Sequence, residues 1–470
     1  MLTVTRPLTT KKLIESYKFE HNGRKILLDV KNSNYFEIDD DVDKVVDLLQ
    51  WREHADLTSG SSPEQIGRAL NDLEENGFLL ETEQESIPSA QPTGVNVLNA
   101  VINISHDCNL RCRYCFASTG HYAGPREFMS EEVACKAMEW FVQQSGSSKE
   151  LNMSFFGGEP LMNFPLIKSL VKYIHILEDR YSKKIYMNIC TNGTILNDEI
   201  IRLIKENNIG MQISLDGPKE IQDTYRPKAD GSGSYDTILA NVKRLLEEVP
   251  SNRIIARATI PHGMIKINEV VAHLFAIGFK TVVFVPAIGC GNVVVQSDDL
   301  KSIKEQYSLI AETFIDNVRG GKNLYVFPFG TEVQNIGEGV KRLYGCGAGI
   351  GFISISVNGD LYPCMRFTNN VTYKLGNVFD GFDNKKRSML FNRTVEQRRQ
   401  CSCCWARYLC GGGCVAVPAE IGNSILENDN RVCEIAKHIA KLAMYVNTVL
   451  TDEGLVYDET KTVDFLRKWF

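Results

Sequence analysis

Residues 97 to 290 alternate between strand-like and helix-like segments, and this alternation restricts the fold more than any other feature of the chain. The intervening stretches, such as EEVACKAMEWFVQQ, carry apolar residues at helical spacing. Repeated strand–helix units favour a parallel sheet with helices outside it. Eight such units close a barrel, so six units predict an α/β fold with a partial (β/α)6 barrel of the TIM type. The six candidate strands are NAVINIS (99–105), LNMSFF (151–156), KIYMNIC (184–190), GMQISL (210–215), IIARATI (254–260) and TVVFVPA (281–287).

Unusual residues lie at the carboxyl ends of these strands. A loop with three cysteines follows the first strand, GGEP (157–160) follows the second and TNG (191–193) follows the third. LDGP (215–218) follows the fourth strand, Arg257 lies in the fifth, and GCG (289–291) follows the sixth. In α/β barrels the carboxyl ends of the strands build the active site. We therefore expect these segments to share one rim.

The cysteines and the charge balance restrict the class of protein. The formal net charge of −6 and the absence of a Lys/Arg-dense run argue against nucleic-acid binding. The chain has no segment of signal-peptide type and no run near the roughly 20 apolar residues that span a bilayer, so we expect a cytoplasmic protein without membrane contact. Clustered thiols in a reducing compartment more often hold metal than form disulfides. Ten of the 14 cysteines fall into two groups, which predicts metal sites.

The first group is the CxxxCxxC loop SHDCNLRCRYCFAS, with Cys108, Cys112 and Cys115. A structural zinc site usually takes four closed ligands on paired arms, and His106 and His121 lie at spacings that do not suit a fourth ligand. A 4Fe–4S cluster normally takes one thiolate for each iron. Three cysteines therefore leave one iron open to a small-molecule ligand.

This motif at a strand end is the hallmark of the radical S-adenosylmethionine (SAM) enzymes, and the chain resembles them. The resemblance implies that Cys108, Cys112 and Cys115 bind a catalytic 4Fe–4S cluster, whose open iron is chelated by the amine and carboxylate of SAM. An electron from the cluster then cleaves SAM to methionine and a 5′-deoxyadenosyl radical.

Other positions match the same family. By resemblance, the backbone of Tyr114 contacts the adenine, and Gly157, Gly158 and Glu159 match the GGE motif that meets the methionyl amine. Glycine lets the backbone approach closely, and a carboxylate complements a cationic amine. Arg257 is suited to the SAM carboxylate, because a guanidinium pairs well with it. Further candidates for SAM contacts, for which ordinary turn residues and surface ion pairs are the alternative interpretation, are Asn192, Ser214, Asp216, Arg226 and Arg257.

The second group consists of Cys346, Cys364, Cys401, Cys404, Cys410, Cys414 and Cys433. Its spacings match the seven-cysteine pattern of SPASM domains throughout. The resemblance implies two auxiliary 4Fe–4S clusters and thus three clusters in the whole chain. Cys403 falls outside the pattern. By position, one auxiliary cluster is held by Cys401, Cys404, Cys410 and Cys433, and the nearer one by Cys346, Cys364 and Cys414.

One departure from the family affects the nearer auxiliary cluster. Sulfatase-maturing relatives have a cysteine six residues after the first SPASM cysteine, and this chain has Phe352 there. We therefore expect another open iron, unless Cys290 or Cys403 fills it. A substrate cysteine thiolate is the natural soft ligand for such an iron.

The pattern of residues 17 to 80 predicts a winged-helix-like module. Asn22-Gly23 predicts a hairpin turn, and YFEI predicts a third strand. Asp39 or Asp40 starts one predicted helix and Ser62-Pro63 another. Both helices are acidic, which argues against contact with DNA phosphates. The module resembles the precursor-recognition domain of peptide-modifying enzymes, which accepts a leader peptide as an added strand.

The predicted organisation therefore has six parts. They are a leader-recognition module (1–82), a linker (83–96), the radical SAM partial barrel (97–300), a connecting segment (301–345), the Cys-rich SPASM domain (346–436), and a C-terminal helix with a tail (437–470).

This layout is most similar to that of maturases which make thioether links in ribosomally made, Cys-rich precursor peptides, of the ranthipeptide or sactipeptide type. In the hypothesis, the leader docks on the N-terminal module and a substrate thiolate binds the open auxiliary iron. The adenosyl radical takes hydrogen from an acceptor carbon, sulfur and carbon couple, and the surplus electron enters the auxiliary cluster. A flavodoxin- or ferredoxin-type protein is the expected electron donor.

Three alternatives stay open at this point. A radical SAM enzyme that makes carbon–carbon links or oxidises a side chain would not need the open auxiliary iron. A non-catalytic iron–sulfur carrier or scaffold would have no use for GGE. A winged-helix transcription factor with a metal sensor conflicts with the acidic helices.

Overall fold

The computed structural model describes residues 11–50, 62–81, 95–289, 291–322, 324–422, 424–455 and 457. Cys290, most of the predicted linker and the end of the predicted tail lie outside these residues.

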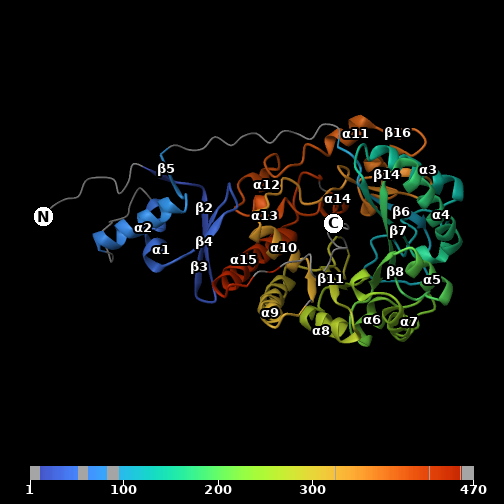
Figure 1. Ribbon diagram of the computed structural model, residues 1–470, viewed down its shortest axis with the longest axis horizontal. Coiled ribbons are helices and arrows are strands. Elements are labelled where there is room, and N and C mark those ends of the chain that lie inside the picture. The colour runs from blue at the N-terminus through green and yellow to red at the C-terminus, as the bar shows by residue number, and fades with distance from the viewer. Residues whose placement is uncertain are drawn as a thin grey trace.

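An 11-stranded sheet forms the centre of the molecule, with the order β12-β11-β10-β9-β8-β7-β6-β13-β14-β15-β16 (Figure 1). The six predicted strands are confirmed, and each pairs in parallel with its neighbours in chain order. They are β6 (Asn99–Ser105), β7 (Glu150–Gly157), β8 (Lys184–Thr191), β9 (Gly210–Ser214), β10 (Ile254–Ile260) and β11 (Thr281–Pro286).

Two further parallel strands extend the sheet, so the prediction of six was incomplete. β12 (Tyr325–Phe327) pairs with β11, and β13 (Phe352–Ile355) pairs with β6. The first lies in the segment predicted to be a connection, and the second in the predicted Cys-rich domain. Neither was predicted, because β12 has only three residues and β13 follows a Gly-rich stretch without periodicity. The antiparallel strands β14 (Asp360–Tyr362), β15 (Gly376–Asn377) and β16 (Gly381–Phe382) continue from β13.

Helices between the strands bury one face of the sheet. Strand residues such as Ile102, Phe155 and Ile189 are 0% exposed and belong to the main hydrophobic core. Since successive strand side chains point to opposite faces, Cys190 and Arg257 point to the inner face of the barrel. The helices are α3 (Glu131–Gln144), α4 (Phe164–Tyr181), α5 (Asp198–Glu206), α6 (Lys219–Tyr225), α7 (Tyr235–Glu248), α8 (Ile267–Ile277), α9 (Asp299–Arg319) and α10 (Phe329–Gly337), with the short helices η1 (Pro160–Asn163) and η2 (Ser251–Arg253).

The N-terminal module contains the predicted three strands and two helices. Asn22 (φ 47°) and Gly23 (φ 77°) form the predicted turn between its first two strands. The side chain of Asp39 accepts the backbone N–H of Val42 at 2.8 Å, and Ser62 forms a capping box with Gln65. The elements are β2 (Ser16–His21), β3 (Arg24–Asp29), β4 (Tyr35–Ile38), α1 (Asp40–Gln50) and α2 (Pro63–Glu75), with β1 (Lys12–Leu13) paired to β5 (Leu79–Leu80).

Both faces of the three-stranded sheet β2-β3-β4 are buried. Leu27 belongs to a small core with α1 and α2, whereas Ile26 and Leu28 belong to the main core. Figure 1 shows the long C-terminal helix α15 (Asn430–Asp452) beside these strands. The N-terminal module is therefore packed against the rest of the protein through α15.

The Cys-rich segment carries short elements: η3 (Met365–Phe367), η4 (Val371–Tyr373), α11 (Asn384–Met389), α12 (Arg399–Ser402), α13 (Arg407–Cys410) and α14 (Ala416–Glu420). Asp429 caps α15, so Cys433 lies on the first turn of that helix and the predicted domain boundary at 436/437 falls inside it. Among the described helices, none combines the length and the apolar character needed to cross a bilayer.

Candidate functional site

The three-cysteine loop after β6 lies directly against the loop after β7. The backbone N–H of Gly158 donates to the carbonyl of Ser105 at 2.8 Å. A Cβ on Gly158 would lie 2.3 Å from the carbonyl oxygen of Asp107, and a Cβ on Gly120 would lie 2.6 Å from the Cβ of Cys108. Only glycine fits at these two positions, and the result is a cradle of bare backbone beside the first cysteine.

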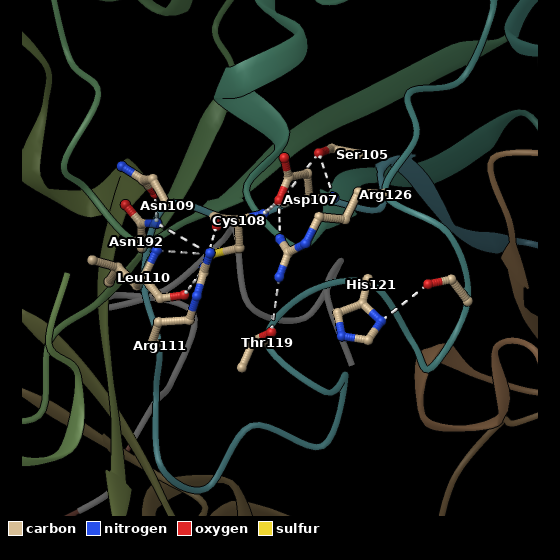
Figure 2. Close-up of polar contacts among 11 residues, drawn as sticks. Ser105, Asp107, Cys108, Asn109, Leu110, Arg111, Thr119, His121, Arg126 and Asn192 are labelled. Atoms are coloured by element: carbon tan, nitrogen blue, oxygen red, sulfur yellow. Dashed lines mark hydrogen bonds and ion pairs between the residues drawn. The ribbon is translucent and has the colours of Figure 1, made fainter. Parts of the chain in front are cut away.

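Polar contacts fix the start of the cysteine loop (Figure 2). Arg126 forms an ion pair with Asp107, whose carboxylate accepts the backbone N–H of Cys108 at 2.8 Å. Arg111 donates to the carbonyl of Cys108 at 2.7 Å. The amide nitrogen of Asn192, from the turn after β8, lies 3.8 Å from the Cys108 sulfur. The loop is thus held from its own ends and from a neighbouring strand end.

Glu159 joins the ends of β7 and β8. Its carboxylate is 0% exposed and accepts hydrogen bonds from the backbone N–H of Leu161 (3.0 Å), the hydroxyl of Thr191 (2.8 Å) and the backbone N–H of Asn192 (2.7 Å). Burial raises the pKa of Glu159 to about 7, although these donors oppose the shift. Both carboxylate oxygens are engaged within the protein, so this side chain sets the positions of two loops. A contact between the GGE segment and an amine ligand stays a prediction.

Tyr114, Asp216 and Arg226 come together although they are far apart in the sequence. The Tyr114 hydroxyl donates to Asp216, and Arg226 donates to the Tyr114 oxygen at 3.0 Å. The backbone N–H of Thr259 donates to the other Asp216 oxygen at 3.0 Å. Burial raises the pKa of Asp216, and the nearby Arg226 opposes this rise. Asp216 (0% exposed) and Arg226 (8%) therefore do not form a surface ion pair, and they hold the middle of the cysteine loop.

Arg257 is a cation on the inner face of the barrel. It lies opposite Ser214 in the β9–β10 register. Burial lowers the pKa of Arg257, and the neighbouring Cys190 opposes this effect. No hydrogen bond or ion pair joins its guanidinium to any other residue of the described chain. A half-buried guanidinium without a carboxylate partner is costly, so the position suits an anionic ligand.

The donors present fit an iron–sulfur cluster with SAM. Burial raises the pKa of Cys108 to about 12 and that of Cys112 to about 11. Thiols shifted in this way need a metal cation in order to lose their protons. Three soft sulfur donors beside a glycine cradle, with the Arg257 guanidinium on the inner face of the same barrel, meet the requirements of a cluster that shares one iron with an anionic small molecule.

The four cysteines predicted to hold the farther auxiliary cluster are brought together, and we call them the farther set. They line one cavity of 320 Å³ near the start of α15, and Cys403 and Cys414 line the same cavity. Burial, together with the other three members as neighbouring thiolates, raises the pKa of Cys433 to about 12. The members of the farther set are Cys401, Cys404, Cys410 and Cys433.

The three cysteines predicted to hold the nearer auxiliary cluster, which we call the nearer set, also lie close together. They are Cys346, Cys364 and Cys414. Burial raises the pKa of Cys364, and the other two thiols raise it further. Cys346 and Cys414 are exposed, so this set is accessible from solvent. The position of the missing cysteine, Phe352, is the first residue of β13.

Cys403 lies with the farther set. It lines the same cavity as Cys401 and Cys404, and its sulfur lies 3.8 Å from the carbonyl oxygen of Arg399, the first residue of α12. Cys414 of the nearer set lines this cavity too, so the position of Cys403 is compatible with either set. Cys290, the other candidate, is outside the described residues.

Tyr122 is a residue of the site that sequence reasoning missed. It is only 5% exposed, and its hydroxyl donates to Asn103 at 3.0 Å. Burial raises the pKa of Tyr122, and nearby thiols, among them Cys115 and Cys364, add to the rise. Its ring centroid lies 6.2 Å from that of Phe116, the residue after Cys115. Its only sequence signal is that it is an aromatic residue in a polar loop. The structure gives it a left-handed φ of 51°.

Comparison with a family model identifies the barrel. Residues 102–270 match the model described as "Radical SAM superfamily". The chain is 26% identical over 286 residues to the radical SAM cyclopropyl synthase TigE of Paramaledivibacter caminithermalis, covering 55% of this chain and 59% of TigE. It is 27% identical over 376 residues to a cysteine-type anaerobic sulfatase-maturating enzyme of Clostridium novyi, covering 73% of this chain and 96% of that enzyme.

Solved structures share the fold. The structure of anSMEcpe with bound AdoMet and Kp18Cys peptide superimposes with a TM-score of 0.64 at 20% identity, covering 76% of this chain and 99% of that one. Streptococcus suis SuiB bound to its precursor peptide SuiA gives a TM-score of 0.53 at 17% identity, covering 90% of this chain and 99% of SuiB. Residues 102–270 of the present chain are therefore similar to radical SAM domains, and the chain shares the fold of these solved structures.

Proposed function

We propose that this protein is a radical SAM peptide maturase which installs thioether crosslinks, from cysteine sulfur to carbon, in a Cys-rich ribosomal precursor peptide. The observation that carries the proposal is the nearer set. It has three cysteines, two of them exposed, and Phe352 stands where sulfatase-maturing relatives have a fourth. Three thiolates would leave one metal position free for the thiolate of a substrate cysteine.

Named residues would hold the catalytic cofactors. Cys108, Cys112 and Cys115 would hold the 4Fe–4S cluster, and Arg257 would pair with the SAM carboxylate. When bound, these cofactors supply a 5′-deoxyadenosyl radical that abstracts a hydrogen atom from carbon. The protein fixes the loops around them, because Glu159 joins the ends of β7 and β8 through three hydrogen bonds. Tyr114 braces the cysteine loop against Asp216.

The auxiliary sites extend this proposal to three clusters. The farther set has four thiols around one cavity, which suits a fully ligated cluster. The nearer set would hold a cluster with an open iron, as would the first loop. Ligation to iron deprotonates a thiol, so a substrate cysteine bound there would need no separate base.

The N-terminal module would recruit the peptide. Its three-stranded sheet has two edge strands, β2 and β4, and an extended leader peptide can add to such an edge through main-chain hydrogen bonds. SuiB, which was solved with its precursor peptide, covers 90% of the present chain and so supports a peptide substrate. A flavodoxin- or ferredoxin-type protein would deliver the electrons.

The test is co-expression with a short Cys-rich peptide encoded beside the gene, followed by mass spectrometry of the peptide. We expect the peptide to lose two hydrogens for each link. Peptides with single cysteines replaced by serine are the matched controls, and each should lose one link. Enzyme with Cys112→Ala should leave the peptide unchanged. Full modification of the serine peptides would exclude thioether formation.

A second candidate function is carbon–carbon bond formation or side-chain oxidation in a peptide or protein. The relationship to a sulfatase-maturating enzyme over 73% of this chain, and to a cyclopropyl synthase over 55%, favours it. This function does not require a substrate thiolate at the nearer set. Alkylation before mass spectrometry counts the free thiols of the product. A modified product that still contains all its free thiols would support the second candidate.

A further inference from the structure

Arg366 connects three separate parts of the molecule. It lies two residues after Cys364, in η3, and its Nε donates to Glu420 of α14 at 2.6 Å. Its Nη2 donates to the carbonyl of Ile288, which follows β11, at 2.8 Å. A Cβ on the next residue, Gly289, would lie 3.1 Å from Nη2, so the backbone passes close to the guanidinium. The side chain is only 23% exposed.

The same guanidinium contacts the catalytic loop. It lies over the ring of Phe116 at 5.4 Å from the ring centroid. Phe116 directly follows Cys115, the last cysteine of the first group, and it is 43% exposed. A cation–π contact of this kind is worth about 0.5–1 kcal/mol at exposed sites and more when water is excluded. Arg366 therefore spans the space between the radical SAM loop and the nearer set.

The guanidinium of Arg366 lies beside the nearer set. Arg366 is the second residue of η3, which begins directly after Cys364, and Glu420 belongs to α14, which begins two residues after Cys414. Phe367 of η3 packs with Cys364 and with Val415, the neighbour of Cys414, in one hydrophobic cluster. Glu420 binds the guanidinium through two contacts. The cation is thus held beside the segments that carry Cys364 and Cys414.

We propose that Arg366 is a positioning residue which holds a positive charge against the nearer set and raises the reduction potential of the cluster there. The inference rests on the proposed function. Joining a carbon-centred radical to a thiolate would form one C–S bond and leave one surplus electron, which a cluster held by the nearer set would accept. A neighbouring cation stabilises the reduced, more negative state, and charge and hydrogen bonds near the sulfurs set cluster potentials.

The test is a redox titration followed by electron paramagnetic resonance. The full chain with Cys108, Cys112 and Cys115 replaced by alanine would carry only the auxiliary clusters. The signal that disappears on adding Cys364→Ala belongs to the nearer set. In this background we expect Arg366→Gln to lower the midpoint potential of that signal. Arg366→Lys, which retains the positive charge, should lower the potential much less. Glu420→Gln, which removes the opposing charge, should raise it.

A matched control removes an arginine from a distant, exposed ion pair. Arg319→Gln breaks the contact with Glu453 and should leave the potential unchanged. Unchanged potentials in both Arg366→Gln and Glu420→Gln, with iron content retained, would overturn the inference. If Arg366→Gln loses the cluster, the midpoint potential of Glu420→Gln tests the inference by itself, and an unchanged value would overturn it. Failure of the proposed function has a different signature, because the co-expressed peptide would then keep its free thiols while Arg366→Gln and Glu420→Gln still shift the potential.

Discussion

The ring of Tyr17 stacks on the ring of Trp405, with centroids 4.1 Å apart and 1° between the ring planes. Tyr17 belongs to β2 of the N-terminal module, whereas Trp405 directly follows Cys404 and lines the cavity of the farther set. The ammonium of Lys441, from α15, lies 5.2 Å from the Tyr17 centroid and 5.8 Å from that of Trp405. The predicted peptide-binding module is therefore attached to the wall of a predicted cluster site.

Removal of this stack should loosen the module. Trp405→Ala deletes the ring contact and the cation–π contact, which together contribute about 1–2 kcal/mol. We expect the backbone amides of β2 to exchange hydrogen roughly tenfold faster, since about 1.4 kcal/mol corresponds to a factor of ten. Trp405→Phe keeps a ring and should give a smaller change. Equal exchange rates in wild type and Trp405→Ala would show that the other contacts of α15 are enough to hold the module in place.

The glycine cradle makes a sharp prediction about SAM binding. Gly158→Ala would place a Cβ 2.3 Å from the Asp107 carbonyl, so the two loops must separate. We expect at least tenfold weaker SAM binding by the iron-loaded protein, measured by equilibrium dialysis, together with partial loss of iron. The control is Gly67→Ala in α2, where a Cβ meets nothing within 4 Å. This change should leave SAM affinity intact and stabilise the helix by up to about 1 kcal/mol.

Local patterns predicted the central strands and the cysteine sets, but not the contacts between them. The six strands were predictable because each one pairs with its neighbour in the chain and alternates with a helix. The pairing of β13 with β6 places Phe352 opposite Asn99, and the sequence around β13 has no periodic pattern that predicts this pairing. Arg366 is a stronger example. Its role depends on Phe116 and Glu420, which come from different segments and meet only in the folded chain.

The candidate site shows the same limit. The spacing of Cys108, Cys112 and Cys115 is enough by itself to predict a metal loop, because all three ligands lie within eight consecutive residues. The partners of Glu159, however, are Thr191 and Asn192, and they follow a different strand. Sequence spacing can thus select ligands that lie on one loop, whereas it does not specify which side chains from other strands hold that loop in place.

The raised thiol pKa values predict the reactivity of the iron-free protein. Because burial raises the pKa of Cys108 to about 12, its thiolate fraction near pH 8 should be on the order of a thousandfold below that of an ordinary thiol. Alkylation by iodoacetamide should therefore be slow at Cys108 and should accelerate as the pH rises, while the exposed Cys403 reacts quickly. Peptide mapping by mass spectrometry after timed alkylation measures both rates. Equal rates at the two sites would contradict the burial of the first loop.

Two neighbouring cysteines offer a direct test of the farther cluster. Cys404 belongs to the farther set, while Cys403 is exposed and its sulfur lies near backbone carbonyls of α12. We expect Cys404→Ala to remove about four irons per chain, because a 4Fe–4S cluster needs all its thiolates there. Cys403→Ala should retain full iron content, measured by colorimetric assay after anaerobic reconstitution. The two cysteines are adjacent in the sequence, and only Cys404 is predicted to bind the cluster. If both variants lose equal iron, Cys403 takes part in binding the cluster; if neither does, the farther set holds none.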